Sequence, residues 1–190
     1  MGQMISVIIA TALVAVLTSA VAVPARAERA QTAGHASIGA LLGYGFDRRM
    51  NVGIGLRGGY TLPMNLYLGG TFMYYLGESD TSAGLVAKID SYYFGVEGGY
   101  DIAAGPVVVR PYLEFGDITV SSSTKGCVTV DASGNQMCMG LASTGSKFGG
   151  GPGVTALYPL GSAFVGADAR YFITTAYNAL TLSLTGGVSF

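Results

Sequence analysis

The sequence has very few charged residues, and this excludes several kinds of protein. Lys, Arg, Asp and Glu make up 11% of the 190 residues, less than half of the roughly 25% that is usual in soluble domains. The net charge is −1, so the composition offers no basic surface to attract DNA or RNA, and we expect no nucleic-acid partner. A chain with so little charge does not have an ordinary water-exposed surface.

Long apolar runs are also missing, except for one at the N-terminus. The run from Ile5 to Val23 is followed by Pro24 and the small-x-small motif Ala25-Arg26-Ala27, which predicts a secretory signal peptide over residues 1–27. No Lys or Arg precedes the run, so an uncleaved membrane anchor is the alternative interpretation. No later run reaches the roughly 20 residues that a membrane-spanning helix needs. If the mature chain crosses a membrane, strands must cross it.

After a short N-terminal segment, 28–36, residues 37–190 divide into segments of about ten residues with alternating polarity, which is typical of transmembrane barrels. We predict eight strands: 37–46, 52–60, 66–76, 89–101, 107–118, 147–158, 163–173 and 179–190. The connections "TLPMN", "IAAGP" and "PLGS" are short, whereas 77–88 and 119–146 are long. The prediction is an all-β, eight-stranded antiparallel transmembrane barrel with short periplasmic turns and longer extracellular loops.

The two faces of these strands differ in the size of their side chains. One face carries Leu, Ile, Val, Phe and Tyr, and the other is rich in glycine and hydroxyl groups. A soluble barrel would turn its apolar face inward, but an eight-stranded barrel is only just wide enough for side chains to pack inside it. We therefore assign the bulky face to lipid and the glycine face to the lumen. Aromatic residues near the strand ends predict two interfacial girdles.

The charges in the middle of the predicted strands fall on the glycine face, and positive and negative charges are equal in number. Because buried charges persist only when they are paired, we predict an ion-pair network in the lumen. The alternative is that some strands are misassigned in register, since a slip of one residue exchanges the two faces. The predicted network consists of Arg57, Glu97, Arg110, Glu114, Asp168 and Arg170.

The chain ends on "LSLTGGVSF", an alternating strand that finishes at Phe190. With this ending and the strand pattern, residues 37–190 resemble the small eight-stranded bacterial outer-membrane barrels of the OmpX and OmpA type. The resemblance implies a multi-pass outer-membrane protein that periplasmic chaperones and the barrel-assembly machinery insert, with Phe190 in the assembly signal. It also implies contact with membrane lipid and lipopolysaccharide. We expect a monomer.

Cysteine and histidine are scarce. The only two cysteines, Cys127 and Cys138, lie in the longest connection of an exported chain, so we predict a disulfide there. The single histidine, His35, lies near the expected mature N-terminus, so no metal site is supported, and no cofactor is expected. Arg48 and Arg49 are candidates for contact with lipopolysaccharide phosphates, with a solvated turn as the alternative.

No catalytic group is evident in the sequence. "GIGLRG", residues 53–58, matches a dinucleotide fingerprint in letters only, because it alternates through a predicted strand. We expect a non-catalytic protein with a structural or surface-interaction role that presents the disulfide-closed loop 120–146. The alternative is a narrow channel for small, apolar solutes, as in the OmpW type. A lipid-modifying outer-membrane enzyme is the weaker alternative, since the predicted barrel wall has no histidine.

Overall fold

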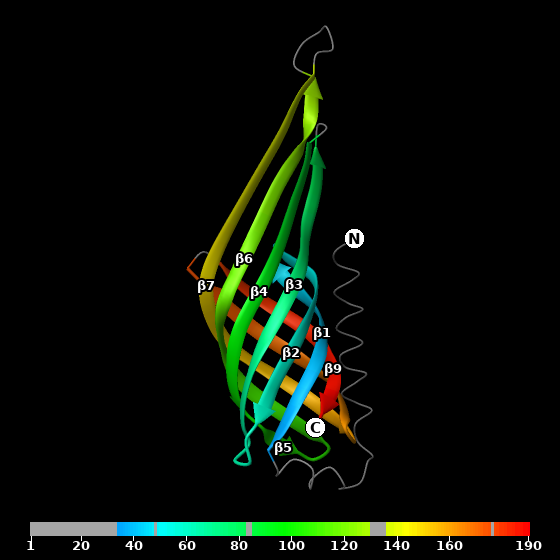
Figure 1. The fold of residues 1–190 in the computed structure, drawn as a ribbon, viewed down its shortest axis with the longest axis vertical. Helices are drawn as coiled ribbons and strands as arrows, with labels where there is room; N and C mark the ends of the chain where they lie inside the picture. The colour runs from blue at the N-terminus through cyan, green and yellow to red at the C-terminus, as the bar shows by residue number, and fades with distance from the viewer. Residues whose placement is uncertain (1–33, 48, 83–84, 130–135, 176) are drawn as a thin grey trace.

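The strands of the chain close into a barrel (Figure 1). The computed structural model describes residues 34–47, 49–82, 85–129, 136–175 and 177–190. The strands of these residues are β1 (His35–Asp47), β2 (Met50–Thr61), β3 (Leu66–Ser82), β4 (Leu85–Tyr100), β5 (Ile102–Ala104), β6 (Val107–Thr129), β7 (Gln136–Leu160), β8 (Ala163–Thr174) and β9 (Asn178–Ser189). None of the described residues forms a helix that is long and apolar enough to cross a membrane.

All the strand pairs are antiparallel, and the pairing runs completely around the barrel. Each long strand pairs with the next long strand, β4 pairs with β6, and β1 pairs with β9. The three-residue strand β5 pairs only with the start of β6. The barrel therefore has eight strands, as the sequence predicts, and each predicted strand lies within or close to an observed one.

Three tight turns lie at one end of the barrel, together with the C-terminus, and we call this the short-turn end (Figure 1). Each turn contains a residue with positive φ: Asn65 (65°), Gly105 (64°) and Gly161 (76°). Glycine and asparagine adopt this conformation at low cost, which is why short turns can form here. The opposite end, where the longest strands project, is the long-hairpin end.

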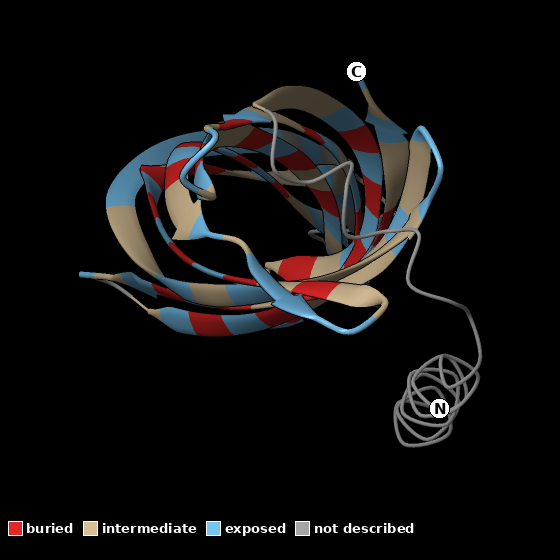
Figure 2. Cartoon of the chain, turned by 90° about the horizontal axis from the view of Figure 1, so that it is seen from below, coloured by how far each residue is buried: buried red, intermediate tan, exposed pale blue. Residues whose placement is uncertain are grey.

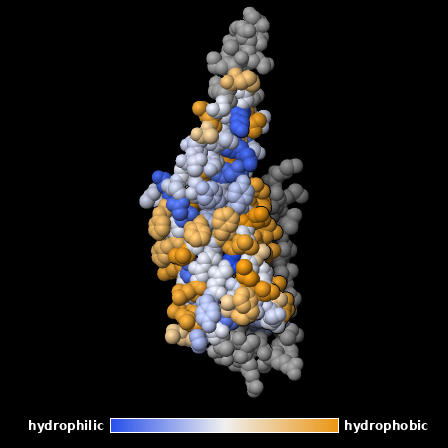
Figure 3. Space-filling view, in the orientation of Figure 1, coloured by the Kyte–Doolittle hydropathy of each residue, from blue (hydrophilic) through white to orange (hydrophobic). Residues whose placement is uncertain are grey.

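The strands alternate between a buried face and an exposed face (Figure 2). The exposed face carries the large apolar side chains, such as Ile54, Phe94 and Leu184. On the side that Figure 3 shows, these side chains form an apolar belt, with hydrophilic residues on the part that projects above it. Every long strand contributes exposed apolar side chains to the barrel wall. The belt belongs to the face that the sequence assigns to lipid.

The segments expected to be long extracellular loops are strand for most of their described length. β3 and β4 pair as far as Ser82 and Leu85, and β6 and β7 pair as far as Thr129 and Gln136. Together they extend the barrel wall as a four-stranded sheet at the long-hairpin end, which we call the protruding sheet. Hydrophobic alternation fails to predict this sheet because it stands outside the apolar belt.

Several glycines of the buried face make room for large rings. A Cβ atom at Gly59 would overlap the ring of Tyr67, and one at Gly153 would overlap the ring of Tyr112. The sequence assigns small residues to the lumen, but it does not predict these tyrosines beside them. The interior is therefore filled by side chains that lie over glycines on neighbouring strands.

Two adjacent glycines of β9, Gly186 and Gly187, allow the packing between β9 and β1 to be tested. A Cβ atom at Gly187 would meet the carbonyl oxygen of Ile38 and the ring of Phe164 at close range, whereas one at Gly186 would lie 3.7 Å from its nearest neighbour. We expect Gly187→Ala to destabilise the barrel by about 1–3 kcal/mol through overpacking. Gly186→Ala is the matched control and should be neutral. Urea unfolding in lipid vesicles measures both, and equal effects would contradict this packing.

Candidate functional site in the barrel lumen

The six charged residues that the sequence assigns to the lumen all lie inside the barrel. β2 supplies Arg57, β4 supplies Glu97, β6 supplies Arg110 and Glu114, and β8 supplies Asp168 and Arg170. None of these residues is more than 7% exposed. They lie on the buried face because they share the alternation of the glycines, so their strands hold the predicted register.

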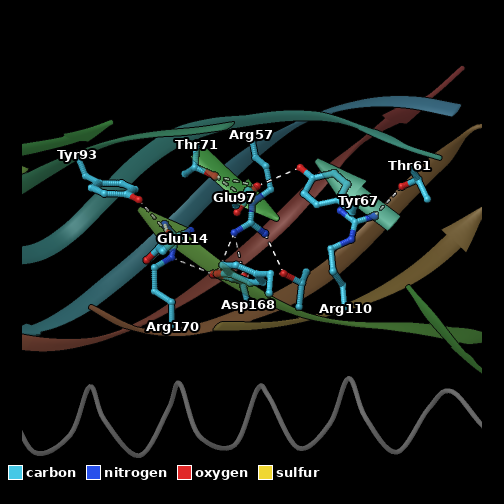
Figure 4. Close-up of polar contacts among 12 residues, drawn as sticks. Arg57, Thr61, Tyr67, Thr71, Tyr93, Glu97, Arg110, Glu114, Asp168 and Arg170 are labelled. Atoms are coloured by element: carbon cyan, nitrogen blue, oxygen red, sulfur yellow. Dashed lines mark hydrogen bonds and ion pairs between the residues drawn. The ribbon is translucent and has the colours of Figure 1, made fainter. Parts of the chain in front are cut away.

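Arg57 is the central cation of this network (Figure 4). Its Nε lies 2.9 Å from Glu97 Oε1, and its Nη2 lies 3.0 Å from Asp168 Oδ2. Nη1 donates a hydrogen bond to Thr155 Oγ1 (2.9 Å), and Nη2 donates another to the hydroxyl of Tyr112 (3.1 Å). These partners lie on β4, β8, β7 and β6, so one guanidinium joins both sides of the barrel.

Arg170 forms a second centre, closer to the long-hairpin end. Its Nη1 lies 2.9 Å from Glu114 Oε2, and its Nε lies 3.2 Å from Asp168 Oδ1. Asp168 therefore binds Arg57 through one oxygen and Arg170 through the other. Tyr93 donates a hydrogen bond to Glu114 Oε2 (3.2 Å). The two centres form one connected network through Asp168.

Arg110 lies near the short-turn end and pairs with Asp101, a residue that the predicted network does not include. Nε and Nη2 of Arg110 lie 2.5 Å and 2.8 Å from the two carboxylate oxygens of Asp101, a bidentate pair. The guanidinium also lies 3.5 Å above the ring of Tyr67. Asp101 follows the end of β4, so strand alternation alone gives no sign of its orientation. With Asp101 added to the six predicted residues, the network has three cations and four carboxylates.

An apolar layer fills the lumen beyond Arg170, toward the long-hairpin end. Its members are buried side chains that point inward from β1, β2, β3, β4, β6, β8 and β9: Leu41, Met50, Met73, Tyr75, Tyr93, Ile118, Phe172 and Ala179. The sequence analysis missed this layer, because inward-pointing apolar residues look like breaks in a polar face. Polar and apolar layers together close the interior.

Tyr177 packs against this apolar layer from the β8–β9 connection. Burial raises the pKa of Tyr177 to about 12. The guanidinium of Arg49, in the β1–β2 connection, lies 4.6 Å from the centre of the Tyr177 ring. Arg49 thus has an intramolecular contact at the mouth of the barrel, and Arg48 lies outside the described residues.

The remaining predicted site residues lie at the two ends of the molecule. Cys127 and Cys138 are directly paired across β6 and β7 and form a disulfide in the protruding sheet. At the short-turn end, the backbone of Phe190 exchanges two hydrogen bonds of 2.9 Å with Ala36, which closes the barrel at the last residue. Within the described residues, no group of three or more His, Cys, Asp or Glu side chains could hold a metal ion.

Similar folds are found among solved structures. No protein-family model matches the chain, and no curated protein matches it. Among solved structures, a major outer membrane protein from Thermus thermophilus has a TM-score of 0.63 and 15% identity, covering 83% of this chain and 100% of that one. Ail, the attachment invasion locus protein of Yersinia pestis, has a TM-score of 0.52 and 14% identity, covering 83% and 99%. The chain therefore has the fold of small outer-membrane barrels.

The connected ion pairs lead to a prediction about Asp168, which bridges two arginines. Asp168→Asn breaks two buried ion pairs at once, those with Arg57 and Arg170, and breaking a buried ion pair costs about 3–5 kcal/mol. We expect Asp168→Asn to lower the free energy of unfolding in lipid vesicles by this amount. Asp80→Asn, at an exposed position on β3, is the control and should change it little. An unchanged urea midpoint for Asp168→Asn would contradict a stabilising role for the network.

Proposed function

We propose that the chain is an integral outer-membrane barrel with a structural or surface-interaction role and no catalytic activity. The observation that carries this proposal is the contrast between a filled lumen and a protruding sheet. Charged, aromatic and apolar side chains occupy the interior from Arg110 to Met50. The groups available to another molecule therefore lie on the surface outside the barrel.

The apolar belt supports a location in a membrane, and the fold supports the outer membrane of a bacterium. Large apolar side chains such as Leu56, Val96 and Phe115 are about half exposed or more, which suits contact with lipid. The proposal includes export directed by the signal peptide and an orientation of the barrel in which the short turns face the periplasm. The chain end at Phe190 is then available to the assembly machinery, and the barrel wall contacts membrane lipid and lipopolysaccharide.

The protruding sheet is the proposed surface for interaction. β7 pairs with β8 only from Gly149 onward, so the preceding part of β7 pairs with β6 alone. The disulfide between Cys127 and Cys138 ties this ribbon together. The opposite edge of the sheet, on β3, has an irregular register after Leu76 and the exposed charges of Glu78 and Asp80, features that discourage strand pairing. The Yersinia pestis neighbour is named as an attachment protein, which is a role of the same class.

A channel is the competing function, and conductance distinguishes the two. We expect purified, refolded protein in a planar bilayer to show no discrete openings. Arg110→Ala should also be silent, although less resistant to unfolding, because Arg57, Arg170 and the apolar layer still fill the lumen. Heat-dependent migration in electrophoresis checks that each sample is folded. Steady openings of the folded wild-type protein, or openings created by Arg110→Ala, would instead support a plugged pore.

Display at the cell surface can be tested with two epitope insertions. An epitope between residues 134 and 135 should bind antibody on intact cells, since it lies in the connection between β6 and β7. The same epitope between Gly161 and Ser162 is the matched control and should be detected only after the outer membrane is permeabilised. The reverse pattern would mean the opposite orientation, and detection of both only after permeabilisation would contradict surface display.

A further inference from the structure

Five buried residues of the network, all except Arg110 and Asp101, form a series of ion pairs of alternating sign. Glu97 pairs with Arg57, Arg57 with Asp168, Asp168 with Arg170, and Arg170 with Glu114, at N–O distances of 2.9–3.2 Å. Both ends of this series are carboxylates. The series therefore contains two positive charges and three negative charges. Arg110 does not belong to it, because Arg110 forms a separate bidentate pair with Asp101.

The two carboxylates at the ends of this series lie on adjacent strands. Glu97 on β4 and Glu114 on β6 are directly opposite in the antiparallel register, and both face the lumen. Directly opposite residues place their Cβ atoms about 4.5–5.5 Å apart, and like charges at such positions are destabilising. Each side chain is 1% exposed, so solvent does not screen the repulsion between the two carboxylates.

Each of these carboxyl groups uses only one of its oxygens. Oε1 of Glu97 accepts hydrogen bonds from Tyr67 (3.0 Å) and Thr71 (3.2 Å) in addition to the ion pair with Arg57. Oε2 of Glu114 accepts from Tyr93 and Arg170. The other two oxygens, Oε2 of Glu97 and Oε1 of Glu114, are buried and receive no hydrogen bond from the described residues.

We propose that Glu97 and Glu114 bind one proton between them and form a buried acid pair in the lumen. One proton cancels the excess negative charge of these five side chains. It also supplies a hydrogen-bond donor to two carboxyl groups that each have an oxygen without a partner. Carboxylates that share a confined site retain a proton for this reason. The proton is assigned to the pair and not to either residue alone.

The other ionisable groups around the pair leave this charge balance unchanged. They are Arg57 from β2, Tyr67 and Tyr75 from β3, Tyr93 from β4, Arg110 and Tyr112 from β6, Asp168 and Arg170 from β8, and Asp101 after β4. The tyrosines are neutral donors, and the arginines are already counted. A metal cation is a poorer fit, because it needs several oxygen ligands, and the guanidinium of Arg170 lies against Glu114 with its Nη2 unbonded.

The proton makes the stability of the barrel depend on pH. The folded chain retains a proton that the unfolded chain releases at neutral pH, so raising the pH favours unfolding. Stability from this source is complete only below the pKa of a glutamate in the unfolded chain, about 4.3, and it falls as the pH rises from there until the folded chain releases the proton. Removing either carboxyl group abolishes this dependence, because the remaining carboxylate and Asp168 balance Arg57 and Arg170.

The experiment compares Glu97→Gln, Glu114→Gln and the double variant, with Glu78→Gln as the control at an exposed position on β3. Infrared spectra of protein refolded in H2O and in D2O report the carbonyl band of a protonated carboxyl group, which shifts on deuteration. We expect this band at neutral pH in the wild type and the control, and its loss in each single variant. The urea midpoint of each single variant should equal or exceed that of the wild type, and that of the double variant should be lower than both.

Three results would overturn the proposal. The first is a wild-type spectrum at neutral pH without a protonated carboxyl band. The second is a band that remains in both single variants, which would assign the proton to another group. The third is a midpoint that depends on the concentration of sodium or potassium at constant ionic strength in the wild type but not in the variants. That dependence would identify a bound cation in place of the proton.

Discussion

The interior of the barrel depends on the interactions of one guanidinium group, that of Arg57. An eight-stranded barrel has room for side chains and little else, so a charge in its centre must find its partners among neighbouring strands. Arginine is suited to this position because its planar group offers five donors in fixed directions. Arg57 uses them to reach Glu97 on one side and Asp168 on the other. Without Arg57, Glu97 would lose its cationic partner, and Asp168 would keep only its ion pair with Arg170.

The space for these long side chains comes from glycine. Tyr67 and Tyr112 lie over glycines of adjacent strands, and both donate hydrogen bonds to carboxylates of the network. The high glycine content and the buried charges are therefore parts of one arrangement, since bulky residues at the glycine positions would displace the rings. The same arrangement fills the lumen with the side chains of the barrel itself.

The sequence predicts most of the barrel and only part of its interior. Alternation identifies the eight strands because lipid and lumen impose opposite demands on neighbouring residues, and it places Arg57, Glu97 and Arg170 correctly on the buried face. It does not reveal Asp101, which follows the end of β4 where alternation stops. It also misses the apolar layer around Met73 and Phe172, and the strands of the protruding sheet, because neither feature follows the rule of apolar outside and polar inside.

The buried charges also favour a single register for the strands that carry them, β2, β4, β6 and β8. A slip of one residue between β4 and β6 would turn Glu97 or Glu114 from the lumen toward lipid. A charge on the lipid face near the middle of a membrane costs roughly 2–4 kcal/mol, and its arginine partner would be left unpaired inside. Apolar residues alone would penalise such a slip less, because many of them are tolerated on either face of a strand. The network therefore favours the native register over a register shifted by one residue, even though a buried ion pair adds little net stability over apolar packing.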